Sequence, residues 1–201
     1  MVALLAACAA PYSAPSATSV WKSVVKVDGA DDIGSGVAVG QSKDGHTAVL
    51  TAYHVVKGET KLTIHGLPAT VLSVDKAHDL ALLDVPVWIP SVDVLPTAPI
   101  PGEPEVTVGF PLGLEETATP GFMGEPNVVT KAKGLQAVSG AMWEGNSGGA
   151  IFVYRDGKWM LAGIADAIAV RGQGTPFEKE YDTIGLCVPS DVIQGFLSHI
   201  A

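Results

Sequence analysis

The chain has 201 residues, 47% of them hydrophobic and 16% charged, which is typical of a globular protein and excludes a disordered or fibrous chain. Its net charge of −9 argues against nucleic acid as a partner, because phosphate binding depends on clustered Lys and Arg. The two cysteines, Cys8 and Cys187, lie far apart and lack metal-ligand spacing, so we expect no disulfide framework, no metal and no other cofactor.

Residues 1–18 are rich in Ala, Pro and Ser, and Leu5-Ala6-Ala7-Cys8 is similar to the lipobox of bacterial lipoproteins. This interpretation makes the segment a signal remnant with a flexible tether, Cys8 a lipidation site, and the protein a lipid-anchored component of the bacterial cell envelope or periplasm. The cationic start and long apolar stretch of a signal peptide are missing, as they would be if the true start lay upstream. The alternative is a disordered tail with an incidental cysteine.

From residue 19 the sequence consists of short runs enriched in Val, Ile, Thr and Leu, separated by Gly, Asp and Pro, which is the pattern of β-strands. In the first half we expect strands within residues 20–27, 34–40, 47–56, 60–66, 69–75 and 80–85. Residues 86–104 hold six prolines. Because proline cannot continue a central strand, we interpret this segment as the connection between two halves.

The second half has the same character, with strands expected within residues 105–110, 127–138, 149–170 and 183–189. Asp156-Gly157 lies between two alternating runs and predicts a hairpin turn. Residues 115–127 are expected to form a mobile loop, and Cys187 is expected to be a small core residue. In the tail, Val192, Phe196 and Ile200 recur every fourth residue, which predicts a helix with Ser190 as its N-cap. Many short strands and one terminal helix indicate an all-β sandwich or a pair of barrels.

The segment Gly145–Gly149 holds Ser147 among glycines, as a nucleophile turn does. The nucleophile elbow of α/β-hydrolases needs a helix after the serine and a histidine later in the chain. Here a strand pattern follows, and His199 is the one later histidine. The elbow is therefore excluded, which leaves the nucleophile turn of another class of serine hydrolase or a glycine-rich turn without chemistry.

A serine nucleophile needs a base within hydrogen-bond reach and a third group to orient that base. The candidate bases are His46, His54, His65 and His78. His54 ends a β-branched run and begins a loop, which fixes its backbone and leaves its ring free. The candidate carboxylates are Asp75, Asp79 and Asp84. Asp79 precedes a buried apolar run and needs a partner there, because an unpaired buried charge is costly. Each residue alone is more often structural, but His54, Asp79 and Ser147 together form a candidate triad.

Three segments resemble the motif blocks of the trypsin-like serine proteases, most closely their HtrA/DegP-like branch: TAYHVV (51–56), HDLALLDV (78–85) and GNSGGAIF (145–152). Further similarity at 34–40, 106–125 and 183–197 extends the resemblance over about residues 20–200, the protease domain alone, without the PDZ domains of that branch. The resemblance implies an all-β fold of two six-stranded antiparallel β-barrels and a short C-terminal helix. The barrels are expected over residues 19–95 and 96–190, and the helix over 191–201.

The same resemblance implies a serine endopeptidase that acts on proteins or peptides. His54 would be the general base, Asp79 its orienting group and Ser147 the nucleophile, with the N–H groups of Gly145 and Ser147 as the oxyanion hole. The substrate-binding residues would be Ala141, Met142, Asp166, Ala167 and Ile168, with Asp166 acting through its carbonyl. These residues predict a small or apolar side chain before the scissile bond. The alternative function is a catalytically inactive binding module on the same fold.

Overall fold

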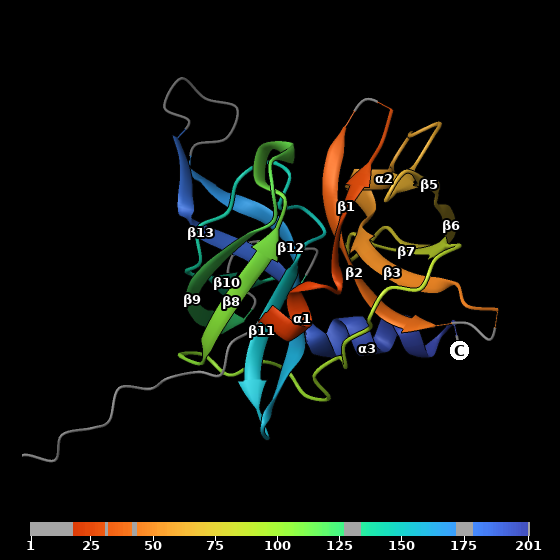
Figure 1. The fold of residues 1–201 in the computed structure, drawn as a ribbon. Helices are drawn as coiled ribbons and strands as arrows, with labels where there is room; N and C mark the ends of the chain where they lie inside the picture. The colour runs from red at the N-terminus through yellow and green to blue at the C-terminus, as the bar shows by residue number, and fades with distance from the viewer. Residues whose placement is uncertain (1–17, 31, 42–43, 127–133, 172–178, 201) are drawn as a thin grey trace, which may run out of the picture.

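The structure is a computed structural model that describes residues 18–30, 32–41, 44–126, 134–171 and 179–200. The proposed lipidation site, Cys8, and the first part of the strand expected over 127–138 lie outside these ranges. The described chain folds into two β-structures side by side, with a helix packed along both (Figure 1). Among the described residues, none of the helices has the length and apolar character needed to cross a membrane.

The first half forms one antiparallel sheet of seven strands in the order β5-β4-β1-β2-β3-β7-β6. Two one-turn helices accompany it, α1 (Thr18–Trp21) and α2 (Tyr53–Val56), and α2 directly follows the central strand β3. The central strands β3 and β7 are buried along nearly their whole length, which explains their continuous apolar sequences. The strands are β1 (Val24–Asp28), β2 (Ile33–Gln41), β3 (Thr47–Ala52), β4 (Thr63–Ile64), β5 (Leu67–Pro68), β6 (Thr70–Asp75) and β7 (Leu80–Val85).

This sheet curls into a half-barrel, whereas the resemblance implied a closed barrel of six strands. Its two edge strands, β5 and β6, are consecutive in the chain and separated by Ala69 alone, yet the described residues form no ladder between them. The physical reason is length, since β4 and β5 contribute two residues each and offer too few backbone groups to pair along β6.

The second half forms a closed six-stranded antiparallel barrel in the order β10-β13-β12-β11-β8-β9, which confirms the expected fold class. The predicted hairpin is confirmed, with Asp156 and Gly157 both at positive φ between Arg155 and Lys158. The loop expected over 115–127 is wrong, because most of it is strand β9, paired with β8 from Gly109↔Thr117 onward. The elements are β8 (Pro104–Gly109), the 3₁₀ turn η1 (Pro111–Gly113), β9 (Thr117–Pro126), β10 (Gln136–Val138), β11 (Ala150–Arg155), β12 (Lys158–Arg171) and β13 (Lys179–Pro189).

The proline-rich segment 86–104 joins the two halves, as predicted, and it bonds to both. Val92 N–H donates to the carbonyl of Ala38 in the first sheet at 3.0 Å, and Leu95 N–H donates to the carbonyl of Leu161 in the barrel at 2.8 Å. The connector therefore holds the two β-structures in one relative position.

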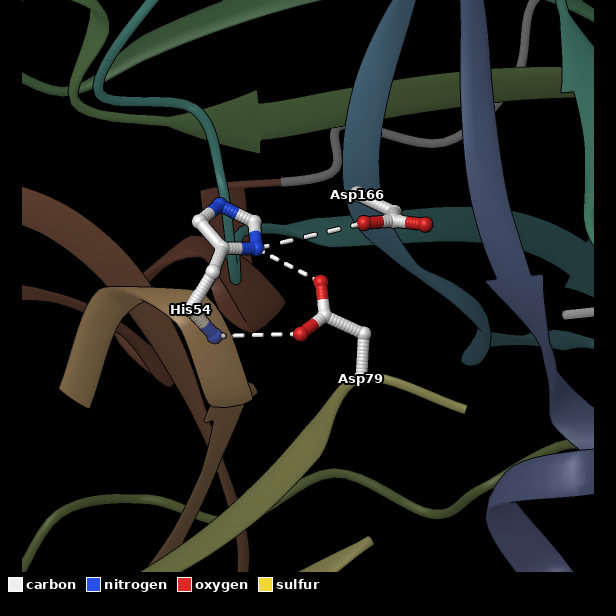
Figure 2. A group of neighbouring side chains, drawn as sticks. All are labelled: His54, Asp79 and Asp166. Carbon is white, nitrogen blue, oxygen red and sulfur yellow. Dashed lines mark hydrogen bonds and ion pairs between the residues drawn. The ribbon is translucent and has the colours of Figure 1, made fainter. Parts of the chain in front are cut away.

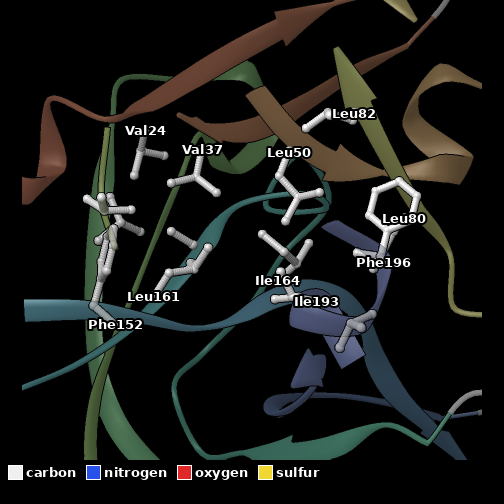
Figure 3. Close-up of a cluster of buried hydrophobic side chains, with 14 of the residues drawn as sticks. Val24, Val37, Leu50, Leu80, Leu82, Phe152, Leu161, Ile164, Ile193 and Phe196 are labelled. Carbon is white, nitrogen blue, oxygen red and sulfur yellow. The ribbon is translucent and has the colours of Figure 1, made fainter. Parts of the chain in front are cut away.

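A single hydrophobic cluster spans both halves and the C-terminal helix α3 (Ser190–Ser198). Leu50 and Leu80 of the first sheet, Ile164 of the barrel, and Ile193 and Phe196 of α3 belong to it (Figure 3). Each such side chain stabilises the fold by about 1.5–3 kcal/mol when fully buried. The interface is therefore rigid core, and residues on its two sides can form one precise site.

The helix begins at Ser190 itself, so the predicted N-cap role of Ser190 is wrong. Its hydroxyl instead donates to the carbonyl of Thr97 in the connector at 2.8 Å, which ties the helix to the segment between the halves.

Candidate active site

Ser147 lies in the turn that leads into β11, on the barrel side of the interface. The turn is fixed by backbone hydrogen bonds to both halves: Ser35 N–H of β2 donates to the Ser147 carbonyl, and Gly148 N–H donates to the Ala165 carbonyl of β12, each at 2.8 Å. The serine side chain is half-buried. The turn therefore presents Ser147 at the line where the first sheet meets the barrel.

Gly148 brings this turn into contact with the chain that carries His54. Gly148 has φ +82°, and a Cβ at this position would lie 2.1 Å from the Ser35 carbonyl, 2.2 Å from Thr51 Oγ1 and 3.0 Å from the Ala52 nitrogen. Ala52 is two residues before His54. A glycine is required here because a side chain has neither the space nor the backbone conformation it needs.

His54 belongs to the single-turn helix α2 at the end of β3, and its side chain is 40% exposed. Its Nδ1 lies 2.6 Å from Asp79 Oδ2, and its backbone N–H donates to Asp79 Oδ1 at 3.1 Å. The two carboxylate oxygens of Asp79 therefore both bind His54, one through its backbone and one through its ring. Figure 2 shows Nδ1 turned toward the carboxylates and the other ring nitrogen turned away from them.

The first sheet contains three histidine–aspartate pairs of almost equal length, so distance alone does not identify the functional one. His46 Nδ1 lies 2.7 Å from Asp84 Oδ2, and His78 Nδ1 lies 2.7 Å from Asp75 Oδ2. The Asp84 and Asp75 side chains are 30% and 27% exposed, whereas that of Asp79 is 7% exposed. Burial and the neighbouring serine turn therefore distinguish the pair of His54.

Asp79 adopts a left-handed backbone conformation, with φ +59°. Aspartate tolerates this region better than most residues, and such conformations cluster at functional sites because the surrounding structure must enforce them. The carbonyl of Asp79 also accepts a hydrogen bond from Tyr53 N–H at 2.9 Å. The turn before β7 is thus locked to α2 by main chain and side chain together.

The predicted substrate-binding residues fall into different environments. Ala167 is exposed, and Ala141 and Ile168 are half-buried, so these three are accessible at the barrel surface. Met142 is 2% exposed and belongs to the barrel core, so its side chain does not line an open pocket. Asp166 is also buried, at 6% exposed, and its Oδ1 lies 3.9 Å from His54 Nδ1. The Asp166 side chain therefore faces His54 from within the structure and is not on the solvent surface.

His54, Asp79 and Asp166 offer one ligand atom each within 4.8 Å of one another, the compactness that a metal site requires. The Nδ1–Oδ2 separation of 2.6 Å leaves no space for an ion between His54 and Asp79 as they stand. Two ligand atoms of one zinc ion lie about 3 Å or more apart, given zinc–ligand distances of about 2.0–2.2 Å. We interpret the group as an imidazole held by carboxylates.

Ser35 is a site residue that the sequence pattern does not indicate. It is fully buried, its hydroxyl donates to the Gly145 carbonyl at 2.7 Å, and the same oxygen accepts from Phe110 N–H at 2.9 Å. With its backbone bond to Ser147, it holds both ends of the nucleophile turn from the opposite sheet. The only signal in the sequence is a small polar residue between two glycines in an apolar strand.

Two buried groups in the barrel have shifted pKa values. Burial raises the pKa of the Cys187 thiol, which agrees with its expected role as a core residue. Burial also raises the pKa of Glu105 on β8 to about 7, and the hydrogen bond that its Oε2 accepts from the Thr107 hydroxyl at 3.0 Å offsets this in part. A backbone hydrogen bond from Gly140, which lies beside the buried Oε1, also offsets part of this rise in pKa. Glu105 is therefore a destabilising charge once it ionises.

We expect Glu105→Gln to remove a pH dependence of stability. Because the folded carboxyl holds its proton up to about pH 7 and the unfolded one releases it near 4.5, the wild-type protein loses stability as the pH rises between these values. The unfolding free energy of the variant relative to the wild type should therefore rise by about 3 kcal/mol from pH 4.5 to pH 8. Urea unfolding across this range measures the difference, with the exposed Glu115→Gln as the control. A constant difference would contradict the prediction.

Comparison with known proteins identifies a matching family and a sequence relative of this chain. Residues 34–164 match the family model described as a trypsin-like peptidase domain. HhoB of Synechocystis sp., which bears the name of a serine protease, is 31% identical over 180 residues, or 83% of this chain. The chain spans 42% of the length of HhoB.

Solved structures share the fold at lower identity. The Rv3671c protease of M. tuberculosis in its active form has a TM-score of 0.73 at 23% identity, covering 90% of this chain and 82% of that chain. The serine endoprotease of Yersinia pestis has a TM-score of 0.71 at 21% identity, covering 93% and 67%. The HtrA-type protease AlgW has a TM-score of 0.72 at 22% identity, covering 91% and 61%. These likenesses establish the architecture.

Proposed function

This chain belongs to the trypsin-like peptidase family, and on that premise we propose that it is a serine endopeptidase whose nucleophile is Ser147. The observation that carries the proposal is the pairing of His54 with the buried carboxylate of Asp79 beside the serine turn, with Nδ1 and Oδ2 2.6 Å apart. The contact of Gly148 with Ala52 and Thr51 brings that turn against the strand that ends at His54. Proteins or peptides are the proposed substrates.

In the proposed reaction, Ser147 Oγ attacks the carbonyl carbon of the scissile bond and its proton passes to Nε2 of His54. Asp79 keeps the other proton on Nδ1, so that Nε2 is free to accept. The imidazolium then gives its proton to the leaving amine, and an ester on Ser147 remains. Water, deprotonated by the same histidine, hydrolyses that ester and restores the serine.

The N–H groups of Gly145 and Ser147 are the proposed oxyanion hole. Within the described residues, neither group donates a hydrogen bond inside the chain. The carbonyl of Glu144 accepts from Leu112 N–H at 2.6 Å, and because a trans peptide is planar, the N–H of Gly145 points the opposite way from that carbonyl. Two free donors next to the nucleophile support this role, and one such donor contributes about 3 kcal/mol to transition-state stabilisation.

A small or apolar side chain before the scissile bond is the proposed preference. Met142 supports it, because a Cβ at Gly185 would lie 2.5 Å from the end of the Met142 side chain, so this methionine already fills the space beside β13. The accessible predicted contacts, Ala141, Ala167 and Ile168, are small or apolar. None of these residues carries an anion to receive Lys or Arg.

Labelling with a fluorophosphonate probe tests the function. We expect the wild-type protein to react at one residue, identified by mass spectrometry as Ser147, and to hydrolyse casein. Ser147→Ala should do neither, whereas Ser198→Ala, which changes an exposed serine on α3, should behave as the wild type. A folded wild-type protein that takes up no probe and cleaves no casein would instead support the alternative, an inactive binding module on this fold.

A further inference from the structure

A second carboxylate faces the histidine of the site from the barrel side. Asp166 places Oδ1 3.9 Å from His54 Nδ1, and its side chain is 4% exposed (Figure 2). Asp79 approaches the same nitrogen from the first sheet at 2.6 Å. The mechanism above uses one carboxylate, and burying a second is costly unless it has a compensating partner. Once protonated, the imidazole of His54 is a cation 3.9 Å from the Asp166 carboxylate.

The position of Asp166 is set by a β-bulge. In the β12–β13 ladder, Ala165 pairs with Cys187 and Ala167 pairs with Leu186, so Asp166 is the extra residue between them. A bulge redirects the side chain of its extra residue, and here the carboxylate points out of the barrel wall toward His54. Ala165, directly before it, exchanges backbone hydrogen bonds with the serine turn at Gly148 and Gly149. Asp166 is therefore held in register with the turn that carries Ser147.

We propose that Asp166 is a positioning residue whose carboxylate, together with that of Asp79, holds the imidazole of His54 and stabilises its protonated form. The kinetic part of this inference rests on the proposed function, because it assumes that His54 is the general base. Asp79 is closer and takes the hydrogen bond from Nδ1, so Asp166 acts through its charge. The substrate contact expected of Asp166 was through its main-chain carbonyl, so the role of the carboxylate is additional to it.

The ionisable groups that face the His54 ring come from two elements. Asp79 lies on the turn before β7 and Asp166 on β12. Tyr53 precedes His54 in the helix α2. Behind Asp166, the neutral thiol of Cys187 lies within electrostatic reach of both Asp166 and Glu105. Two buried anions around one imidazole favour the imidazolium, and an anion at this distance moves a titration by about 1–3 pH units.

A direct test follows the titration of His54 by NMR in the Ser147→Ala protein, with ¹⁵N-labelled histidine. Adding Asp166→Asn should lower the midpoint of the His54 titration by about 1 pH unit or more. Adding Asp84→Asn, which makes the same change beside His46, should leave it in place. An unchanged midpoint with Asp166→Asn overturns the proposal. This readout needs no proteolysis, so it holds even if the proposed function fails.

The second test measures kcat/KM against pH in proteins that keep Ser147. Because the base must be neutral to accept a proton, Asp166→Asn should extend activity to lower pH by the same interval, with KM nearly unchanged. Asp166→Ser, which places a smaller neutral residue there, should shift the acid limb of the pH profile by the same amount. This second variant keeps the test valid if Asp166→Asn does not fold. If the wild type is active and neither variant moves the acid limb, the role of Asp166 is refuted while the proposed function stands. If the wild type is inactive, the proposed function fails and the NMR result decides the role of Asp166 alone.

Discussion

Replacing Asp79 by asparagine is expected to lower kcat by about 10⁴-fold at neutral pH, through the wrong tautomer of His54. The structure gives the reason in atoms. The backbone N–H of His54 donates to Asp79 Oδ1, so an asparagine would keep its carbonyl oxygen on that side and turn its NH₂ group toward Nδ1. Nδ1 would then have to accept a hydrogen bond, and the ring proton would move to Nε2, where it prevents proton transfer from Ser147.

Asparagine is the right substitution because it also tolerates the positive φ of residue 79, so the turn before β7 should keep its conformation. Casein hydrolysis and the rate of fluorophosphonate labelling measure the loss, and circular dichroism checks the fold. Asp84→Asn, which removes the carboxylate beside His46, serves as the control and should leave both rates unchanged. A loss of less than about tenfold would show that Asp79 does not orient the base, since even one mispositioned group at a triad costs more.

Alanine in place of Gly148 is expected to destabilise the fold by roughly 2–5 kcal/mol. The added Cβ would meet the Ser35 carbonyl at 2.1 Å and Thr51 Oγ1 at 2.2 Å, and both atoms belong to the opposite sheet. The positive φ adds about 1–2 kcal/mol of strain, and overpacking typically costs about 1–3 kcal/mol more. The added methyl group would push the serine turn away from the strand that ends at His54. Because this separates Ser147 from His54, activity should fall as well.

Thermal unfolding measures this loss, with a decrease in Tm of about 10 °C expected for a chain of this size. Two glycine variants separate the causes. Gly45→Ala has the same positive φ but nothing within 4 Å, so it reports backbone strain alone. Gly195→Ala lies in α3 with open space and ordinary φ, and it should stabilise the protein by about 0.5–1 kcal/mol. Equal effects at Gly148 and Gly45 would refute the contact between the two sheets.

Local sequence patterns were sufficient for the elements that local chemistry controls. The strands β3 and β7, the Asp156-Gly157 turn and the terminal helix follow from short apolar runs, turn chemistry and helical spacing, which act over a few residues. The strand β9 was missed because Pro120, Gly121 and Gly124 read as loop residues, whereas long-range pairing with β8 and β10 makes them strand. Propensity in strands yields to pairing partners.

By itself, the sequence determined the all-β class, the family resemblance and three candidate site residues, because these depend on residue types at fixed spacings along the chain. The tertiary structure alone decided which of three similar histidine–aspartate pairs has its carboxylate buried beside the serine turn, that the first sheet stays an open half-barrel, and that Glu105 is a buried acid with a raised pKa. It also decided that Ser35 holds the serine turn, and that the carboxylate of Asp166, a residue expected to act through its carbonyl, faces His54. Ser35 bonds to a residue 110 positions away, and a bulge turns Asp166 out of the barrel wall toward His54. Such contacts arise from the packing of two sheets against each other, and no local pattern encodes them.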